Sequence, residues 1–358
     1  MYRKICILHD FFFSAGGGEK LILTLAKALG ADVYTTHVER SVLKNLGYED
    51  VSVRSVGQVP TNQFLAAEIA TFWYSTLQLK EKYDAYILSG NWAHCAALHH
   101  HPNIFYCHTP VRYFYDSKER FLKNFSPFVG SILRTAIWVQ SRYDKFTVRH
   151  VDKIVANSRN VQQRIRKYYG RNSVIVHPPV DTKKYGFKSI GDYWLSVNRI
   201  TPDKRIELQC EIFRKLKNEK LVVVGKIERQ AKDYFASLQP PENVRFVGEC
   251  NEADLIKLYA NCRGLITTAI DEDFGMTPLE AMASGKVVLA VNEGGYRETV
   301  IDGVTGWLLP PQPDAFARKI QELEEKKLFE MREACITQAK RFDVKVFVEK
   351  MKALIEQV

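Results

Sequence analysis

The 358-residue sequence lacks any uncharged apolar run that approaches the roughly 18 residues that a membrane-spanning helix requires. Its first apolar segment, MYRKICILHDFFF, has too short an apolar core for a signal peptide and is better explained as a first β-strand. The seven cysteines are scattered and lack Cys-x-x-Cys spacing. An odd, scattered set in apolar segments is typical of reduced core residues, so we expect a cytoplasmic protein.

Acidic residues are scarce in one part of the chain. Residues 101–185 contain sixteen Lys or Arg and five Asp or Glu, whereas the segments on either side are nearly balanced, so this region carries the net charge of +10. Such a surplus suits an anionic membrane surface, a phosphate-bearing substrate or nucleic acid. No zinc-finger, RNP or KH signature is present, so we expect no nucleic-acid partner. The one histidine cluster, His99-His100-His101, is consecutive and its side chains diverge, so we expect no metal site.

Short apolar segments alternate with amphipathic helical segments along the whole chain. This alternation predicts an α/β protein with parallel sheets covered on both faces. Two such runs flank the stiff segment His177–Asp181, which contains Pro178-Pro179. We therefore expect two Rossmann-like domains, residues 1–180 and 181–342, with ligands at the carboxyl ends of the strands.

The stretch Thr267–Leu289 combines acidic residues with a helix start. A strand leads into Asp271–Asp273 and a turn at Phe274-Gly275, and we expect Pro278 to open a helix that Gly285 closes. A helix N-terminus binds anions through its free N–H groups, here those of Met276, Thr277 and Leu279.

Two carboxylates flank this helix start, Glu272 before it and Glu280 in the expected first turn. Together with the anion site they suggest a ligand with both phosphate and hydroxyl groups, such as a nucleotide sugar. The alternative is a capped strand–helix unit in which the acidic residues only complement the helix dipole.

Three more strand ends carry polar residues. Arg199 and Lys204 follow the strand at 193–197, where Arg and Lys suit phosphate oxygens, although a solvated loop pair would look the same. The first strand ends at His9-Asp10, followed by a loop with Gly17 and Gly18 that matches neither G-x-G-x-x-G nor the P-loop, so a simple tight turn remains an alternative. His108 ends the strand NIFYCH, where a packed strand-end histidine is the alternative to a ligand contact.

These segments together resemble the retaining GT-B glycosyltransferases that use nucleotide-diphosphate sugars. The resemblance extends over GGGEK, YCHTPVRYFYD, VANSRNVQQRI, VHPPVD, EDFGMTPLEAMASGKVV and EGGYRETVIDGVTGWLL, in the family's order and over nearly the whole chain. The EDFG variant with CHTPVRY is most similar to mannosyltransferases of polysaccharide and glycolipid assembly. The fold implied is two Rossmann-like domains that face each other across a central cleft, the first binding the acceptor and the second the donor.

The resemblance also implies residue roles. Arg199 and Lys204 would hold the diphosphate without a metal ion, Glu272 would face the donor sugar, and Glu280 would bind the ribose. The catalytic set would be His108, Arg199, Lys204 and Glu272. Donor binding would add Phe274, Gly275, Met276, Thr277 and Glu280, and an acceptor or diphosphate loop would comprise Gly17, Gly18, Asp10 and Arg112. The final helix, 343–358, would pack on the first domain.

The activity implied is transfer of a hexose, mannose from GDP-mannose, to a glycan or lipid-linked acceptor with retention of configuration. Because no carboxylate nucleophile is evident, we expect front-face substitution. A UDP-sugar transferase, an epimerase of the same fold and a non-catalytic nucleotide-sugar-binding module are the alternatives. The aromatic, basic helices around Arg112–Arg149 are expected to rest on an anionic membrane, on its inner face, unless they form an ordinary basic domain surface.

Overall fold

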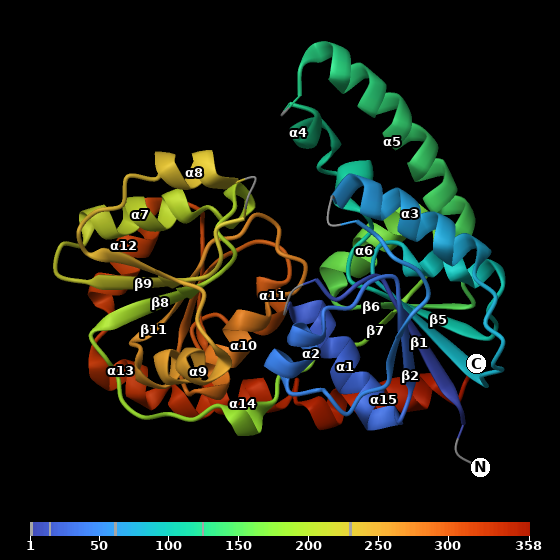
Figure 1. Cartoon of the computed structure of the whole chain (residues 1–358). Coiled ribbons are helices and arrows are strands. Elements are labelled where there is room, and N and C mark those ends of the chain that lie inside the picture. Colours follow the sequence, from blue (N-terminus) through green and yellow to red (C-terminus); the bar gives the residue numbers. More distant parts are fainter. Residues whose placement is uncertain (1–2, 14–15, 61–62, 124, 229–230) are drawn as a thin grey trace. The chain divides into compact units, whose positions relative to one another are not determined.

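The computed structural model describes residues 3–13, 16–60, 63–123, 125–228 and 231–358. The chain forms two compact units, Met1–His177 with Phe347–Val358, and Pro178–Val346 (Figure 1). Each unit is built around its own parallel sheet with helices on both faces. The predicted α/β class is therefore confirmed.

The first unit contains, within the described residues, a seven-stranded sheet in the order β3-β2-β1-β4-β5-β6-β7, with every pair parallel. Its strands are β1 (Ile5–His9), β2 (Asp32–Thr35), β3 (Val53–Ser55), β4 (Ala85–Ser89), β5 (Asn103–Cys107), β6 (Lys153–Ala156) and β7 (Val174–Ile175). Its helices are α1 (Gly17–Leu29), α2 (Arg40–Leu46), α3 (Gln63–Thr76), α4 (Lys118–Leu122), α5 (Pro127–Val148), α6 (Arg159–Tyr169) and the 3-10 helices η1 (Ala93–Leu98) and η2 (Arg112–Phe114).

The central strands of this sheet are buried on both faces because successive side chains alternate between two cores. Ile5 and Ile7 of β1 belong to one core with α1 residues, whereas Cys6 and Leu8 belong to the other with α3, η1 and α5 residues. The helix α15 (Val344–Ile355) supplies Phe347 and further apolar residues to the first of these cores. Continuous apolar strands such as ICIL are what this double burial requires.

The second unit contains a six-stranded parallel sheet among the described residues, in the order β10-β9-β8-β11-β12-β13. Its strands are β8 (Tyr193–Val197), β9 (Lys220–Val224), β10 (Val244–Gly248), β11 (Gly264–Thr267), β12 (Val288–Val291) and β13 (Gly306–Leu309). Its helices are α7 (Ile206–Lys215), α8 (Lys232–Ser237), α9 (Glu252–Asn261), α10 (Met276–Ala283), α11 (Tyr296–Thr299), α12 (Pro313–Glu322), α13 (Glu325–Glu330), α14 (Arg332–Lys340), with 3-10 turns η3 (Thr182–Lys184) and η4 (Pro202–Lys204).

The strand orders create one point in each sheet where the direction of winding reverses. In the first sheet β1 pairs with both β2 and β4, and in the second β8 pairs with both β9 and β11. Loops that leave two adjacent strands in opposite directions open a crevice at their carboxyl ends, which is where open α/β sheets bind ligands. Candidate site residues should therefore follow β1 and β4, or β8 and β11.

Candidate functional site

The reversal point of the second sheet brings together two of the predicted charged residues. Lys204 lies in η4, after β8, and Glu272 lies in the loop after β11. Lys204 Nζ donates to Glu272 Oε2 at 2.6 Å, and the two side chains are only 15% and 20% exposed. Partial burial reduces solvent screening, so this ion pair is stronger than one on the open surface. Arg199 lies on the same loop as Lys204 and its side chain is exposed.

Backbone hydrogen bonds fix the two loops to each other. The Ile270 N–H donates to the Asp203 carbonyl oxygen at 2.8 Å, and the Thr268 hydroxyl donates to the Lys204 carbonyl oxygen at 2.8 Å. Gln209 Nε2 of α7 in turn donates to the Thr268 hydroxyl. The position of the Lys204 ammonium group relative to Glu272 is therefore set by the backbone as well as by charge.

A third segment, Glu293–Tyr296 after β12, completes this site, and sequence reasoning assigned it no role. The Gly295 N–H donates to the Glu272 carbonyl oxygen at 2.7 Å, and the Tyr296 hydroxyl lies 3.5 Å from Glu272 Oε2. Gly294 has a φ of +53°, and a Cβ there would lie 2.3 Å from the Glu272 carbonyl oxygen. Two adjacent glycines are needed because this backbone lies directly against that of the acidic loop.

Glu293 anchors the start of the same segment. Its carboxylate accepts a hydrogen bond from Arg205 Nη1 at 2.9 Å and one from the Asp271 N–H at 3.2 Å. Arg205 and Asp271 both adopt positive φ, at 48° and 46°. Such conformations cost energy in residues other than glycine, and they persist where surrounding contacts impose them. The carboxylate of Glu293 supplies two of those contacts.

The helix α10 begins two residues earlier than expected, at Met276 with Gly275 as its N-cap. Pro278 is therefore the third helical residue, and the first-turn N–H groups of Met276 and Thr277 lack intrahelical acceptors. Gly275 has a φ of +86°, and a Cβ there would lie 2.7 Å from the Tyr296 ring. Phe274 is buried in the core, so its side chain is structural and only its backbone remains a candidate for donor binding.

Glu280 lies in the second turn of α10, so the expectation that it occupies the first turn was wrong. Its Oε2 accepts a hydrogen bond from the buried Tyr259 hydroxyl at 2.8 Å. Burial, and then the Glu280 charge, raise the pKa of Tyr185, which hydrogen bonds to the same carboxylate. Because the dipole effect falls off within the first turn, these two tyrosines, rather than the helix dipole, hold Glu280.

The reversal point of the first sheet contains neutral groups instead of an ion pair. His9 ends β1, Ser89 ends β4, and His108 directly follows β5. The Ser89 hydroxyl lies 3.3 Å from His9 Nδ1 and 3.0 Å from His108 Nε2. Burial lowers the pKa of His108 to about 4, and burial together with the neighbouring His108 lowers that of His9 to about 3. Both imidazoles are therefore neutral at physiological pH and act only through hydrogen bonds.

Two protein families match the two halves of the chain. Residues 178–342 match the family described as Glycosyl transferases group 1, and residues 15–184 match Glycosyltransferase Family 4. The fold is similar to that of Anabaena Alr3699/HepE in complex with UDP and glucose, at 20% identity and a TM-score of 0.77 over 99% of this chain and 100% of that chain. The chain is a glycosyltransferase with the GT-B fold.

A second solved structure and two mannosyltransferases are also similar to this chain. The GT-B enzyme is similar to a sucrose-phosphate synthase of Thermosynechococcus elongatus, at 16% identity and a TM-score of 0.78 over 99% of each chain. It is 26% identical to the alpha-1,3/1,6-mannosyltransferase ALG2 of Dictyostelium discoideum over 89% of each chain. It is 27% identical to ALG2 of Saccharomyces cerevisiae, over 89% of this chain and 77% of the relative. The expected likeness to mannosyltransferases is confirmed.

The glycine loop of this glycosyltransferase lies inside the start of α1. The helix begins at Gly17, with Gly16 as N-cap, so Gly17 and Gly18 belong to the helix rather than to a loop before it. A Cβ on Gly18 would lie 3.6 Å from His108 Cε1, so this turn of the helix packs on the imidazole ring. The loop therefore brings a helix N-terminus to the same reversal point as His108.

The Asp10 carboxylate has a structural role in this unit, and its place in an acceptor or diphosphate loop stays a prediction. Its buried carboxylate accepts hydrogen bonds from the N–H groups of Asn91, Trp92 and Ala93. Burial raises the pKa of Asp10 to about 6, while these three N–H groups oppose the rise. A Cβ on Gly90 would overlap the carboxylate, so the loop can pass over Asp10 only with glycine there. Asp10 thus holds the loop that leaves β4.

Arg112 pairs with a carboxylate of its own unit in this structure. Its Nη2 lies 3.2 Å from Asp116 Oδ2, and the nearly buried Arg164 lies 3.8 Å from the same oxygen. Arg164 Nη1 also donates to the Thr109 hydroxyl at 2.9 Å, one residue after His108. Arg112 and Arg164 therefore share the Asp116 carboxylate.

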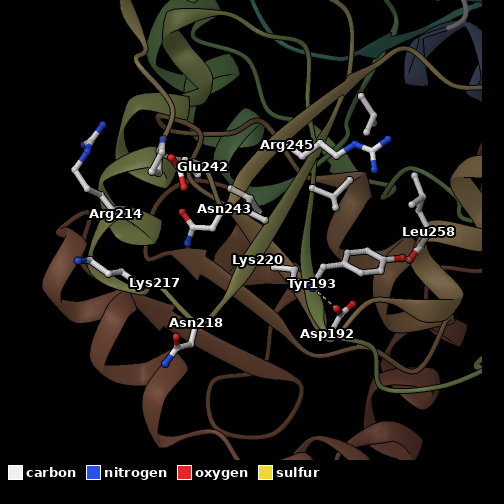
Figure 2. Close-up of a pocket in the computed structure, with 14 residues that line it drawn as sticks. Asp192, Tyr193, Arg214, Lys217, Asn218, Lys220, Glu242, Asn243, Arg245 and Leu258 are labelled. Atoms are coloured by element: carbon white, nitrogen blue, oxygen red, sulfur yellow. Dashed lines mark hydrogen bonds and ion pairs between the residues drawn. The ribbon is translucent and has the colours of Figure 1, made fainter.

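A cavity of about 940 Å³ lies in the second unit (Figure 2). Neither Lys204 nor Glu272 is among the residues that line it. Tyr193 and Lys220, which begin β8 and β9, line it together with Arg214 and Lys217. It therefore lies at the amino ends of strands whose carboxyl ends carry the candidate site. No helix of the described residues is long and apolar enough to cross a membrane, and within the same residues no group of three His, Cys, Asp or Glu is placed to hold a metal ion.

Proposed function

We propose that this enzyme transfers mannose from GDP-mannose to a glycan or lipid-linked acceptor. The observation that carries the proposal is the Lys204–Glu272 pair at the reversal point of the second sheet, beside the N-terminus of α10. A cation and a helix N-terminus bind a diphosphate, and a carboxylate binds sugar hydroxyls. The choice of mannose is supported by the names of the ALG2 relatives.

The donor is proposed to bind with its diphosphate between Arg199, Lys204 and the first turn of α10. Arg199 is exposed on the loop that holds Lys204, so its guanidinium can reach a phosphate that enters from solvent. Lys204 would keep Glu272 as one partner and take a phosphate oxygen as another, since an ammonium group has three donors. The two cations then neutralise the charge that develops on the leaving nucleoside diphosphate, without a metal ion.

The reaction is proposed to retain configuration by front-face substitution. The acceptor oxygen bonds to the anomeric carbon as the bond from that carbon to the phosphate oxygen breaks, and the acceptor proton passes to the departing phosphate. Glu272 is held by Lys204 and lies near Tyr296, which favours a hydrogen-bonding role over that of a nucleophile. A mannosyl adduct trapped on Glu272 or Asp273 would contradict this mechanism.

The first unit is proposed to position the acceptor through the residues at its own reversal point. The neutral imidazole of His108 would bind a sugar hydroxyl or a phosphate oxygen, with Ser89 fixing its orientation. Arg112 and Arg164, which both lie near the Asp116 carboxylate, would suit an acceptor that carries phosphate. Gly17 and Gly18 would supply the N–H groups of the α1 N-terminus.

Membrane attachment is proposed to occur through α5. Phe128, Ile132, Val139 and Phe146 are all exposed and recur at helical spacing, so they form one stripe, which we name the α5 stripe. Arg142, Lys145 and Arg149 lie on the adjacent side of the helix axis. An exposed apolar stripe flanked by cations is the pattern of helices that lie in an anionic membrane interface. Salt-sensitive flotation with anionic vesicles is expected, and its absence would contradict attachment.

The central test is a donor screen with GDP-, UDP- and ADP-sugars. We expect acceptor-dependent release of GDP from GDP-mannose, and unchanged activity in the presence of a chelator. Release from a UDP-sugar instead would favour the UDP-dependent alternative. Isomerisation without acceptor would favour an epimerase, and binding without turnover would favour a non-catalytic module.

A further inference from the structure

A narrow cavity of about 160 Å³ lies between α3 and α5 in the first unit. Glu68 and Thr71 of α3, Val139 and Tyr143 of α5, and the aromatic rings of Trp92 and Phe114 are among the residues that line it. We name this cavity the α3–α5 slot. Dry, apolar cavities of about 150 Å³ bind molecules the size of benzene, so the slot fits a hydrocarbon segment of about six carbons.

The slot is a built feature of the fold rather than a gap between loosely packed helices. The Tyr143 hydroxyl donates to the Ser75 hydroxyl at 2.6 Å and so ties α5 to α3. Buried His94 and Asp144 line the slot and form an ion pair at 3.2 Å. The Tyr115 hydroxyl donates to the same Asp144 carboxylate. The first bond ties α5 to α3, and the other two tie α5 to η1 and to the end of η2, so the walls of the slot are joined to one another.

One buried polar atom at the slot lacks a hydrogen-bond partner among the described residues. His94 is 1% exposed, and its Nδ1 has no hydrogen-bond partner among the described residues. Burial disfavours the charged imidazolium, but Cys95 and Asp144 outweigh burial and raise the pKa of His94 to about 10. A buried donor without an acceptor costs about 1–3 kcal/mol, and because a hydrocarbon has no acceptor atom, a water molecule rather than a bound chain would complete this donor.

The position of the slot connects the α5 stripe with the candidate acceptor site. Val139 belongs to both the stripe and the slot lining, and it is 54% exposed, so the slot opens beside the stripe. Trp92 comes three residues after Ser89, on the loop that the Asp10 carboxylate holds. The slot is thus built on the same strand edge that carries Ser89 and His108.

We infer that the α3–α5 slot binds one hydrocarbon chain of a membrane lipid, acyl or prenyl, when the α5 stripe lies on an anionic bilayer. The inference rests on the proposed membrane attachment. The cations Arg142, Lys145 and Arg149 beside the stripe complement anionic headgroups, and a chain segment fits the narrow, mostly apolar slot. A chain bound there would fix how the enzyme lies on the membrane relative to His108.

Photolabelling tests this inference without requiring turnover. Vesicles of phosphatidylcholine and phosphatidylglycerol would contain a trace of phosphatidylglycerol with a diazirine at the end of one acyl chain. After irradiation, mass spectrometry should locate label in residues 66–76 of α3 or 139–144 of α5. Competition by unlabelled polyprenyl phosphate or by excess phosphatidylglycerol would show whether the slot favours a prenyl or an acyl chain.

A matched pair of variants separates the slot from the membrane surface. Val139→Trp should block the slot and reduce the slot label at least tenfold. Val129→Trp, on the same helix and outside the slot lining, should leave that label unchanged. Thr71→Phe fills the slot from α3 and serves as a second test if Val139→Trp does not fold. Equal slot labelling in wild type, Val139→Trp and Thr71→Phe, or label confined to Phe128, Ile132 and Phe146, would overturn the inference.

The result is distinguishable from failure of the proposed function. Label in the slot of a protein that transfers no sugar would retain the lipid site and contradict only the transferase activity. Sugar transfer by an enzyme whose slot is not labelled would retain the transferase activity and contradict only the lipid site. If the slot instead holds an apolar side chain of a protein partner, labelling will not depend on vesicles and lipid will not compete. That result also overturns the inference.

Discussion

The reversal points of the two sheets differ in charge although the two units have the same architecture. In the second unit Lys204 and Glu272 form an ion pair, and Arg205 and Glu293 form another beside it. In the first unit, His9, Ser89 and His108 form a chain of neutral hydrogen-bonding groups. Equivalent positions in one kind of fold therefore carry different chemistry, and the residues rather than the fold decide what each can bind.

The difference follows the demands of the two halves of a glycosyl transfer. A diphosphate carries negative charge that must be matched by cations, whereas a sugar acceptor offers hydroxyl groups that neutral donors and acceptors suffice to bind. A protonated His108 would put a cation among groups that otherwise act as neutral hydrogen-bond donors and acceptors. Burial prevents this by holding the pKa of His108 near 4.

The largest expected effect is loss of the cation in the second unit. Lys204→Ala should lower kcat by about 10²–10³-fold, because it removes charge from the proposed leaving-group site. Steady-state kinetics with GDP-mannose would measure the effect. Lys217→Ala, which removes an exposed cation from the cavity at the opposite edge of the same sheet, is the matched control and should leave kcat unchanged. Comparable losses in both variants would mean that overall charge, not this site, controls the rate.

The second-largest expected effect comes from the close packing of the Gly294 backbone against the backbone of Glu272. Gly294→Ala should destabilise the protein by more than the about 1–2 kcal/mol cost of positive φ, because its Cβ would also overlap the Glu272 backbone. Gly303→Ala is the control, since Gly303 has a φ of +72° and no atom within 4 Å of the added Cβ. Urea unfolding measures both. Equal destabilisation would show that the segment 293–296 does not support the acidic loop.

A smaller effect is expected at the neutral site. His108→Gln should reduce kcat by about tenfold, the equivalent of about 1.4 kcal/mol or one hydrogen bond. The rate of the wild-type enzyme should show no titration of His108 between pH 6 and 8, since its pKa lies near 4. A loss as large as that of Lys204→Ala would erase the distinction between the two reversal points.

The same histidine should also affect stability as a function of pH. Between the ordinary pKa of 6.5 and about 4, the unfolded chain binds a proton at His108 that the native protein does not, so stability falls as pH falls through this window. His108→Gln should flatten that dependence. Asp10, with its pKa raised to about 6, acts in the opposite direction but equally in both proteins. Urea midpoints at pH 7 and 5 would reveal the difference, and identical slopes would contradict a neutral buried His108.

Much of this architecture could be predicted from local sequence. Continuous apolar strands and amphipathic helices indicated two parallel sheets. At the start of α6, Ser158 is a residue type typical of helix N-caps, and its hydroxyl accepts a hydrogen bond from the Val161 N–H. The start of α10 was misplaced because proline is tolerated throughout the first turn, so Pro278 marked the turn but not its first residue. The local sequence predicts which helices and strands form more accurately than it predicts the residues at which they begin and end.

Long-range contacts explain the remaining differences. The partners of Asp10 lie about eighty residues further along the chain, so the local sequence could not reveal the structural role of its carboxylate. Likewise, Gly294 and Gly295 indicate close backbone approach, but nothing local names Glu272 as the segment approached. The Lys204–Glu272 pair could be anticipated because both residues follow strands, although their direct contact depends on β8 and β11 being neighbours.

The account depends most directly on diphosphate recognition by Lys204. Calorimetric titration of GDP and GMP into wild type and Lys204→Ala, with Lys217→Ala as control, isolates the contribution of the second phosphate. We predict that wild type and Lys217→Ala bind GDP about ten- to a hundredfold more tightly than GMP, as one or two charged hydrogen bonds would give, and that Lys204→Ala loses most of this preference. An unchanged preference in Lys204→Ala would contradict the account.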